Sequence, residues 1–351
     1  MKIGILTGGG DAPGTNAVIR SLTQALTHGQ GATVIGIEDG FLGLMERRVR
    51  PMDWSAVGSA IALGGTLLGS TNRASPLSYQ GEDRRGEVLA CAKALGLDGL
   101  VVIGGDGTLA IAEAMNRFGL PTIGVPKTID NDIHGVERSF GFDTAVARAA
   151  EGIERVLTSG QSMHRVMLVE TMGRHAGWIA LEAGIAAGAD IILLPELAFD
   201  IDAIADICRA REARQGFTTV CVAEGAKPRG GEAVARAWVE GAPEPERLGG
   251  IAAVLAHQLQ ARLSCEVRSV ALGHVQRGGP PTASDRVLGT HYGVATADLV
   301  REGAWGCMVT WVGGRMARAE LASVAGRSRA VPLDAPLLDV ARQMDVSFGQ
   351  V

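Results

Sequence analysis

Residues 2–6 of the chain read KIGIL, and residues 7–16, which follow directly, read TGGGDAPGTN. The first run is short and apolar, so it predicts a buried first β-strand rather than a signal peptide. The second run is rich in glycine and opens a helical pattern, which predicts a tight turn from strand to helix. A strand, a glycine turn and a helix in this order are typical of parallel α/β sheets.

The same alternation continues through most of the 351 residues. Short apolar runs predict further strands at residues 33–37, 100–103, 122–125, 165–170, 191–194, 218–223, 267–272 and 308–312. Their continuous apolar character indicates strands that are buried on both faces and are therefore parallel. Together with the helical patterns between them, these runs predict an α/β fold with two doubly wound, Rossmann-like lobes and mainly parallel sheets.

Two further features describe the organisation of the chain. A second β/α series starts with the helix after Asp143, which sets a boundary near Gly141. Residues 227–247 are rich in glycine, proline and charge, so they predict an exposed loop.

The composition narrows the class of protein. A net charge of −5 does not favour binding to nucleic acid or to an anionic membrane. The five cysteines lie far apart without metal-ligand or redox spacing, which fits a reducing cytoplasm. The most apolar stretch, residues 178–194, is too short and too interrupted by charge to span a membrane. We therefore expect a cytoplasmic protein with no nucleic-acid or membrane partner.

Two glycine-rich segments follow predicted strands. In residues 7–16 the glycines let the backbone approach an anion, although a plain tight turn is an equal alternative. In residues 104–108, which read GGDGT, Asp106 can hold Mg²⁺ that is bound to phosphate oxygens. Gly107 leaves room there for a nucleotide triphosphate. The alternative for Asp106 is a helix cap in a glycine turn.

Residues 126–132, which read PKTIDND, follow the predicted strand at 122–125. Two carboxylates, Asp130 and Asp132, stand beside the hydroxyl of Thr128 and the ammonium of Lys127. A carboxylate near a substrate hydroxyl can act as a general base, and the lysine can offset charge on a phosphoryl group in transfer. The alternative is a solvated acidic turn.

Two more segments carry cations after predicted strands. Residues 172–177 read MGRHAG, in which Arg174 suits bidentate contact with phosphate oxygens. Residues 273–279 read GHVQRGG and place His274 three residues before Arg277. Arg277 could instead be a charge on the rim of a site, and His274, taken singly, is better interpreted as a rim charge or a structurally satisfied histidine.

Together and in this order, the five segments resemble the 6-phosphofructokinase family, from Lys2 to about Gly313. The resemblance implies the phosphofructokinase fold. It also implies a lobe for ATP and Mg²⁺, made of residues 1–141 plus about 276–326. A lobe for the sugar phosphate would consist of residues 142–275 plus about 327–351.

The resemblance implies a role for each matching residue. Asp130 takes the proton from the 1-hydroxyl of fructose 6-phosphate, with Lys127, Thr128 and Arg174 as its catalytic partners. The residues that match donor-binding positions are Gly10, Arg73, Gly105, Asp106, Gly107 and Thr108, with Asp106 as the Mg²⁺ ligand and Phe41 beside the adenine. Those that match sugar-binding positions are Thr128, Asp130, Asp132, Met172, Gly173, Arg174, Glu224 and Arg277. Arg165, Arg268 and His274 match positions that bind the 6-phosphate, and the two arginines come from a neighbouring subunit.

The phosphoryl donor depends on two positions. ATP-dependent bacterial members typically have glycine at both, whereas pyrophosphate-dependent members pair aspartate with lysine. This chain combines Gly107 with Lys127, a mixed pattern that resembles an actinobacterial-type group in which both donors occur. An aspartate at position 107 would repel the α-phosphate of ATP, and glycine leaves that volume open. The pair therefore favours ATP.

The family's effector site is less basic in this chain. Arg20 is retained, but Gln24 and Leu157 stand where the resemblance leads us to expect further cations, and residues 213–216 carry only Arg214. An effector phosphate would lose most of its countercharge. We expect weak or absent control by ADP and phosphoenolpyruvate.

The sequence thus predicts an ATP-dependent 6-phosphofructokinase of glycolysis, a homodimer or homotetramer whose active sites are shared between subunits. The nearest alternative uses pyrophosphate as the donor. Another is a catalytically silent paralogue that senses sugar phosphates. A third is an NAD or lipid kinase, which shares only the GGDGT segment. A related acceptor such as sedoheptulose 7-phosphate also stays open.

Overall fold

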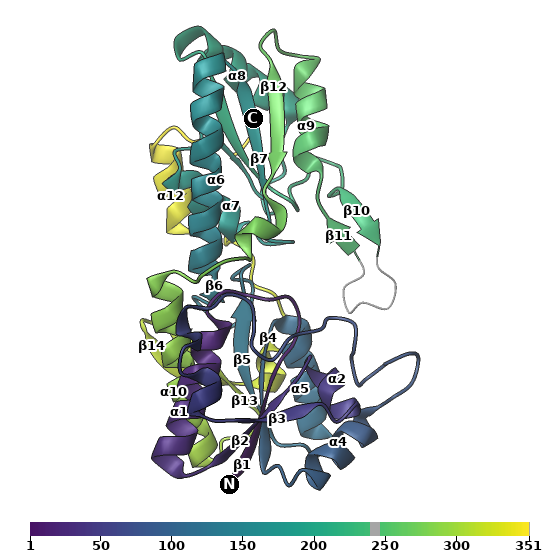
Figure 1. The fold of residues 1–351 in the computed structure, drawn as a ribbon. Helices are drawn as coiled ribbons and strands as arrows, with labels where there is room; N and C mark the ends of the chain where they lie inside the picture. Colours follow the sequence, from purple (N-terminus) through teal and green to yellow (C-terminus); the bar gives the residue numbers. More distant parts are fainter. Residues whose placement is uncertain (239–245, 351) are drawn as a thin grey trace.

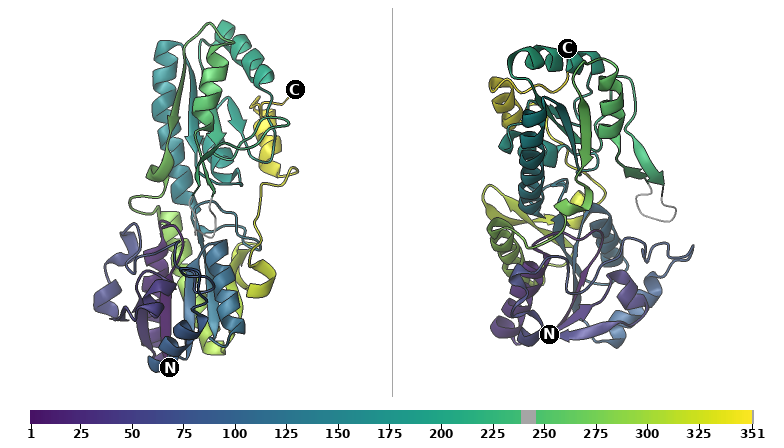
Figure 2. Two further views of the ribbon diagram at one scale, coloured as in Figure 1. Left: turned by 90° about the vertical axis from the view of Figure 1, so that its right-hand side faces the viewer. Right: turned by 45° about the horizontal axis from the view of Figure 1, so that its top comes forward.

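The computed structural model describes residues 1–238 and 246–350, which form two lobes stacked end to end (Figure 1). Each lobe is built on its own sheet, and the two termini lie in different lobes (Figure 2). Because apolar runs alternate with helices along the chain, both sheets become covered by helices on their two faces.

The first lobe contains an eight-stranded sheet in the order β14-β13-β5-β4-β1-β2-β3, with β6 beside β5. Its central strands are parallel, whereas the edge strands β3 and β14 run antiparallel to their neighbours. The bounds are β1 (Lys2–Thr7), β2 (Thr33–Ile37), β3 (Val49–Met52), β4 (Gly99–Gly104), β5 (Thr122–Thr128), β6 (Phe140–Gly141), β13 (Cys307–Val312) and β14 (Arg315–Glu320).

Helices cover both faces of this sheet. On one face lie α1 (Thr15–Gln30) and α10 (Ala283–Glu302), and on the other lie α2 (Phe41–Met45), α4 (Arg85–Ala94), α5 (Asp106–Arg117) and α11 (Leu321–Val324). Helices α1 and α10 pack closely, because a Cβ on Gly289 would lie 2.9 Å from the Gly14 carbonyl oxygen. Short helical turns at α3 (Trp54–Val57) and η1 (Ala60–Ala62) follow β3.

The second lobe contains a four-stranded parallel sheet in the order β12-β7-β9-β8. The strands are β7 (Val166–Thr171), β8 (Ile191–Leu193), β9 (Thr218–Ala223) and β12 (Val267–Ala271). One face carries α6 (Phe142–Met163), α7 (Trp178–Ala186) and α12 (Pro336–Gln343), and the other carries α8 (Ile201–Arg214) and α9 (Ile251–Gln260). The short helix η2 (Gly273–Gln276) follows β12.

Residues 227–247, expected as a loop, contain a short antiparallel hairpin. Its strands are β10 (Ala235–Trp238) and β11 (Glu246–Leu248), and residues 239–245 lie outside the described part of the chain. All four residues of β10 are exposed, so no apolar alternation marks the strand in the sequence. The prediction of exposure is confirmed for these four residues, and the prediction of a loop is wrong for the two strands.

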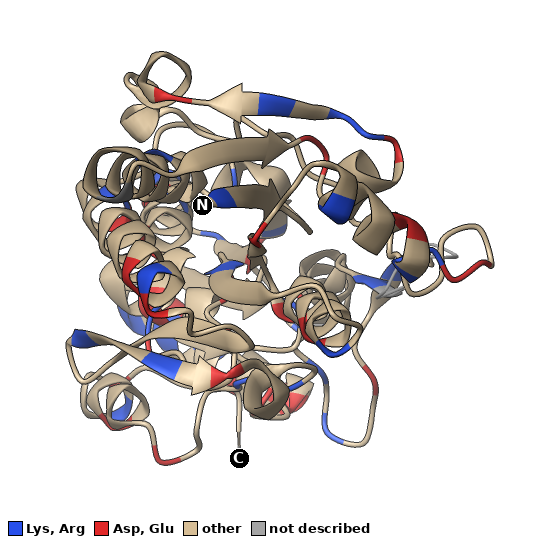
Figure 3. Cartoon of the chain, turned by 90° about the horizontal axis from the view of Figure 1, so that it is seen from below, with Lys and Arg blue, Asp and Glu red and all other residues tan. Residues whose placement is uncertain are grey.

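Charge is distributed without a single dominant sign. In Figure 3 basic residues (blue) and acidic residues (red) are interspersed along the chain. Among the residues that the structure describes, no helix is both long enough and apolar enough to cross a membrane.

Candidate active site

A cavity of about 740 Å³ lies between the two lobes, at the carboxyl ends of parallel strands. Ligands of open α/β sheets bind at this edge, because the loops that follow the strands converge there. The predicted residues that line the cavity are Gly10, Gly105, Asp106, Gly107, Thr108, Lys127, Thr128, Asp130, Met172, Arg174, Glu224, His274 and Arg277. Phe41, expected beside the adenine, also lines it.

Two glycine turns pack against each other on the wall formed by the first lobe. The turn after β1 approaches the turn after β4 so closely that a Cβ on Gly8 would lie 2.7 Å from Cγ2 of Thr108. Gly9 has a φ of 78°, in the left-handed region that favours glycine. The glycines therefore allow two strand ends to share one small space.

The loop after β5 holds Asp130 at the floor of the cavity. Asp130 is buried, with 3% of its surface exposed, and its Oδ1 has no hydrogen-bond partner among the described residues. The hydroxyl oxygen of Thr128 accepts a hydrogen bond from the Asp130 amide at 3.0 Å. That hydroxyl donates to Oδ1 of Asp132 at 3.2 Å. A buried acceptor without a donor is costly, which indicates that the site is organised for a donor supplied by a ligand.

Asn131 keeps this loop in shape. Its backbone has a φ of 53°, and its side chain accepts from the Ser139 amide at 3.0 Å and donates to the Glu137 carbonyl at 3.2 Å. These two bonds tie both sides of the loop together, so the Asp130 side chain is held by backbone geometry rather than by its own contacts.

Asp132 does not line the main cavity. It lines an adjacent cavity of about 230 Å³ together with Asp106 and Arg174. Burial and the nearby carboxylates of Asp130 and Asp106 raise the pKa of Asp132 to about 7. A neutral Asp132 would limit repulsion among the three carboxyl groups near neutral pH.

Lys127 connects β5 to the first glycine turn. Its side chain is buried, and Nζ donates a hydrogen bond to the carbonyl oxygen of Gly10. Burial, followed by the nearby guanidinium of Arg277, lowers the pKa of Lys127 to about 7. Arg277 donates to the Asp11 carbonyl at 3.0 Å, so two cations support the backbone of this turn. A Cβ on Gly10 would lie 3.2 Å from Nη1 of Arg277, which leaves little space for a larger residue.

The wall formed by the second lobe is organised by Glu224. Its Oε1 accepts from the amides of Gly173 at 3.2 Å and of Arg174 at 2.9 Å. Burial raises the pKa of Glu224 to about 7. Gly173 has a φ of 140°, and a Cβ there would lie 2.5 Å from the Ala176 carbonyl oxygen, so the turn requires glycine. The turn directs Arg174 across the cavity, where Nη1 lies 3.8 Å from Oδ1 of Asp106.

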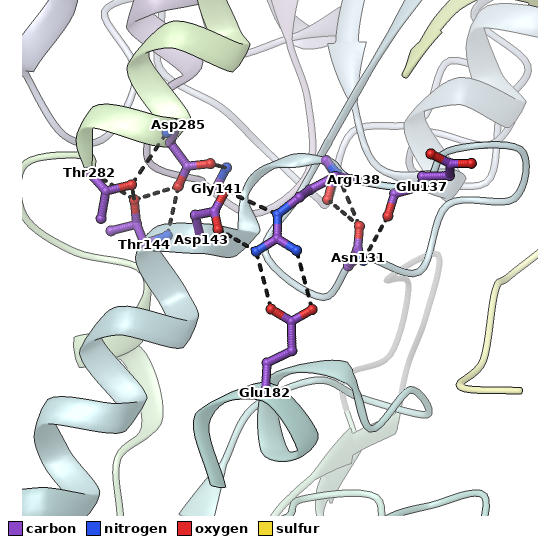
Figure 4. Close-up of polar contacts among 10 residues, drawn as sticks. Asn131, Glu137, Arg138, Gly141, Asp143, Thr144, Glu182, Thr282 and Asp285 are labelled. Carbon is purple, nitrogen blue, oxygen red and sulfur yellow. Dashed lines mark hydrogen bonds and ion pairs between the residues drawn. The ribbon is translucent and has the colours of Figure 1, made fainter. Parts of the chain in front are cut away.

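The connection between the lobes is fixed by a second network (Figure 4). Asp285 of α10 is fully buried, and it accepts from the amides of Gly141 at 2.9 Å and Thr144 at 2.7 Å, at the start of α6. Burial raises the pKa of Asp285 to about 6. Arg138 joins Asp143 of α6 to Glu182 of α7. These contacts position the loop that carries Asp130 relative to both lobes.

Other predicted residues lie outside the main cavity. Arg165 precedes β7 and Arg268 lies near the start of β12, so both lie at the amino ends of their strands, away from the cavity. Both pair with Glu266. Gly173 supports Arg174 without lining the cavity. Arg73 is exposed and is not among the lining residues, so its contact with the donor stays a prediction.

Sequence reasoning did not point to the hairpin of the second lobe, four of whose residues line the cavity. Arg236 and Trp238 of β10 and Arg247 and Leu248 of β11 reach it from the hairpin of the second lobe. The only signal in the sequence was three arginines and one tryptophan within residues 227–247, a segment rich in glycine, proline and charge.

The residues present fit a Mg²⁺ site that is completed by phosphate. The Asp106 side chain lines the cavity and is 27% exposed, so one carboxylate is available beside the glycine turns. No group of three or more His, Cys, Asp or Glu side chains in the described part of the chain could hold a metal on its own. Mg²⁺ typically uses one or two carboxylates and takes its other ligands from water and substrate phosphates.

Comparisons with known proteins agree with this geometry. The phosphofructokinase family matches residues 2–300. The ATP-dependent 6-phosphofructokinase 2 of Clostridium perfringens is 44% identical, over 99% of this chain and 98% of that protein. The pyrophosphate–fructose 6-phosphate 1-phosphotransferase of Amycolatopsis methanolica is 42% identical, over 95% and 96%.

A solved phosphofructokinase from Saccharomyces cerevisiae superimposes with a TM-score of 0.80 at 29% identity. It covers 92% of this chain, which spans 45% of the yeast chain's length.

Proposed function

We propose that this chain, which belongs to the phosphofructokinase family, is an ATP-dependent 6-phosphofructokinase of glycolysis. It transfers the γ-phosphate of ATP to the 1-hydroxyl of fructose 6-phosphate and gives fructose 1,6-bisphosphate. The observation that carries the proposal is the buried, unpartnered Oδ1 of Asp130 in a cavity that both lobes line. The first lobe, residues 1–141 plus about 276–326, binds the donor, and the second, residues 142–275 plus about 327–351, binds the sugar phosphate.

Asp130 acts as the general base in this proposal. Its Oδ1 accepts the proton of the 1-hydroxyl as that oxygen attacks the γ-phosphorus in line. Thr128 keeps the loop in place through its bonds to the Asp130 amide and to Asp132. Arg174 spans the cavity and Lys127 supports the glycine turn, so both offset negative charge on the phosphoryl group in transfer.

We further propose that Asp106 holds Mg²⁺ together with the donor phosphates. The bound ion would offset charge on those phosphates. The glycine turns that contain Gly10 and Gly107 provide backbone amides and open space for the same phosphates.

The shared active site is also a proposal. Arg165 and Arg268 lie away from their own cavity, which fits a role in a neighbouring subunit's 6-phosphate site. A homodimer or homotetramer in the cytoplasm would bring them there. Mixing inactive Asp130→Ser with inactive Arg268→Ala chains should restore partial activity if sites are shared, and should restore none if each site is built from one chain.

One matrix of donors and acceptors tests the reaction. ATP and pyrophosphate are each supplied with fructose 6-phosphate and with sedoheptulose 7-phosphate, and the bisphosphate product is measured. We expect ATP with fructose 6-phosphate to give the highest kcat/KM. Pyrophosphate is the second candidate donor, since Lys127 lines the cavity and a relative at 42% identity carries that name. A higher kcat/KM with pyrophosphate would establish it instead, and no turnover with either donor would refute both.

A further inference from the structure

The hairpin formed by β10 and β11 is attached firmly to the second lobe. At its base, the Gly249 amide donates to the Val234 carbonyl at 3.1 Å. The buried carboxylate of Glu170, in β7, accepts from the amides of Gly250 at 2.8 Å and Ala252 at 2.9 Å. The hairpin therefore starts from a fixed point at the beginning of α9.

From this base the two strands extend toward the side of the first lobe that carries α2 and α5 (Figure 1). Arg236 and Trp238 both belong to β10, whose pairing register with β11 shifts between Ala235 and Ala237. Both line the cavity, as does Arg247 of β11, together with Phe41 and Ile111 of the first lobe. The hairpin thus brings side chains of the second lobe into the cavity that is also lined by the first lobe, the lobe proposed to bind the donor.

The balance of charges in the cavity indicates a role for Arg236 and Arg247. Apart from the hairpin, the described lining contains four carboxylates, Asp11, Asp106, Asp130 and Glu224. The corresponding cations are Lys127, Arg174 and Arg277. A nucleoside triphosphate adds several further negative charges, so Arg236 and Arg247 provide countercharge that the floor of the cavity lacks.

Trp238 points to the chemistry of the ligand. Seventy per cent of its surface is exposed, although a tryptophan on a strand surface normally packs against a neighbour. A flat aromatic ring that lines the same cavity as the apolar side chains of Phe41 and Ile111 suits the face of a purine base.

We propose that the β10–β11 hairpin is a second nucleotide-binding element, in which Arg236 and Arg247 bind donor phosphates and Trp238 stacks on the base. This inference rests on the proposed function, since it takes ATP as the donor. The hairpin makes ATP preferable to pyrophosphate, because a donor without a base cannot use Trp238.

The test uses Trp238→Ala, the double variant Arg236→Ala/Arg247→Ala, and Arg229→Ala as a matched control. Arg229 is an exposed arginine outside the cavity. We expect Trp238→Ala to raise the KM for ATP roughly fivefold or more. The double variant should raise it by about tenfold. The KM for fructose 6-phosphate should stay within about twofold of the wild-type value in Trp238→Ala and in the double variant. In Arg229→Ala, the KM for ATP and the KM for fructose 6-phosphate should both stay within about twofold.

Two binding measurements test the role of the hairpin independently of the proposed catalytic function. Inhibition by inorganic tripolyphosphate should weaken in the double arginine variant and not in Trp238→Ala. ADP should quench tryptophan fluorescence in the wild type and less in Trp238→Phe, whether or not turnover occurs. An active wild type with an unchanged KM for ATP in all variants would overturn the inference alone. So would a rise confined to the KM for fructose 6-phosphate, which would assign the hairpin to the sugar.

Discussion

Replacing Asp130 with serine separates the catalytic value of this residue from its structural cost. A general base typically contributes 10² to 10⁴ in rate, so kcat should fall by about that factor. At about 1.36 kcal/mol for each tenfold step, the loss in transition-state stabilisation is about 3–5 kcal/mol. KM should change little, because the proton moves only as the bond to phosphorus forms.

The structure predicts that Asp130→Ser, which lowers kcat, does not lower the free energy of unfolding. Because Oδ1 of Asp130 is buried without a partner, the carboxylate costs the free enzyme about 1–3 kcal/mol. Asp130→Ser removes this cost, so its free energy of unfolding in urea should equal or exceed that of the wild type. A loss of rate combined with retained stability identifies a functional residue rather than a structural one.

The assay couples formation of fructose 1,6-bisphosphate to a spectroscopic readout, with urea unfolding measured on the same preparations. Asp298→Ser is the control, since Asp298 pairs with Arg301 on the surface of α10 and should leave kcat unchanged. An Asp130→Ser variant that keeps more than about a tenth of the wild-type kcat would refute Asp130 as the general base. A fall in activity that comes with a comparable fall in stability would assign Asp130 a structural role instead.

Three other changes have defined outcomes. Asp285→Asn replaces an acceptor of two backbone amides with a group that can no longer accept from both sides, so urea unfolding should show a loss of about 2–4 kcal/mol; an unchanged midpoint would contradict the role of this network. Burial raises the pKa of Glu224 to about 7, so the folded state binds its proton more tightly than the unfolded state; its contribution to stability is complete below about pH 4.5 and is lost as the pH rises through 7. Glu224→Gln, which can still accept from both amides, should remove roughly 3 kcal/mol of that dependence, and an identical pH profile of urea unfolding would show that the shift is absent. Arg20, expected at an effector site, donates to the Gly58 carbonyl at 3.2 Å and lies 4.9 Å over the ring of Trp54, so millimolar phosphoenolpyruvate should leave the fructose 6-phosphate curve in place; a tenfold shift of that curve would refute the loss of control.

The sequence predicts the parallel strands well because their apolar runs are continuous. Strands β1, β4, β7 and β9 lie within one residue of their expected positions, and β5 continues three residues beyond its expected end at residue 125. The edge strands β3 and β14 were not predicted, since one contains a proline and the other, which reads RMARAE, has no apolar run. Such strands form because a neighbouring strand offers unpaired backbone groups, and this condition is not visible in the local sequence.

The candidate site shows a similar division. The residues in glycine turns and in the loop after β5 were predicted because their types and spacing carry the chemistry. The supporting contacts were not, because they depend on the tertiary arrangement. Lys127 on the Gly10 carbonyl and Asp285 on the start of α6 each join segments more than a hundred residues apart. The hairpin was missed because its strands have no local signal, since their exposed residues show no apolar pattern.

The interleaving of the two lobes affects how the chain folds during synthesis. Strand β13 and helix α10 complete the first sheet only after the whole of the second sheet has been made, and α12 then completes the core of the second lobe. Neither core can close before the ribosome has released most of the chain. Until then the edge of β5 and the face of α1 that receives α10 stay open to other chains. We therefore expect folding to be slow and late, and to depend on chaperones at high rates of expression.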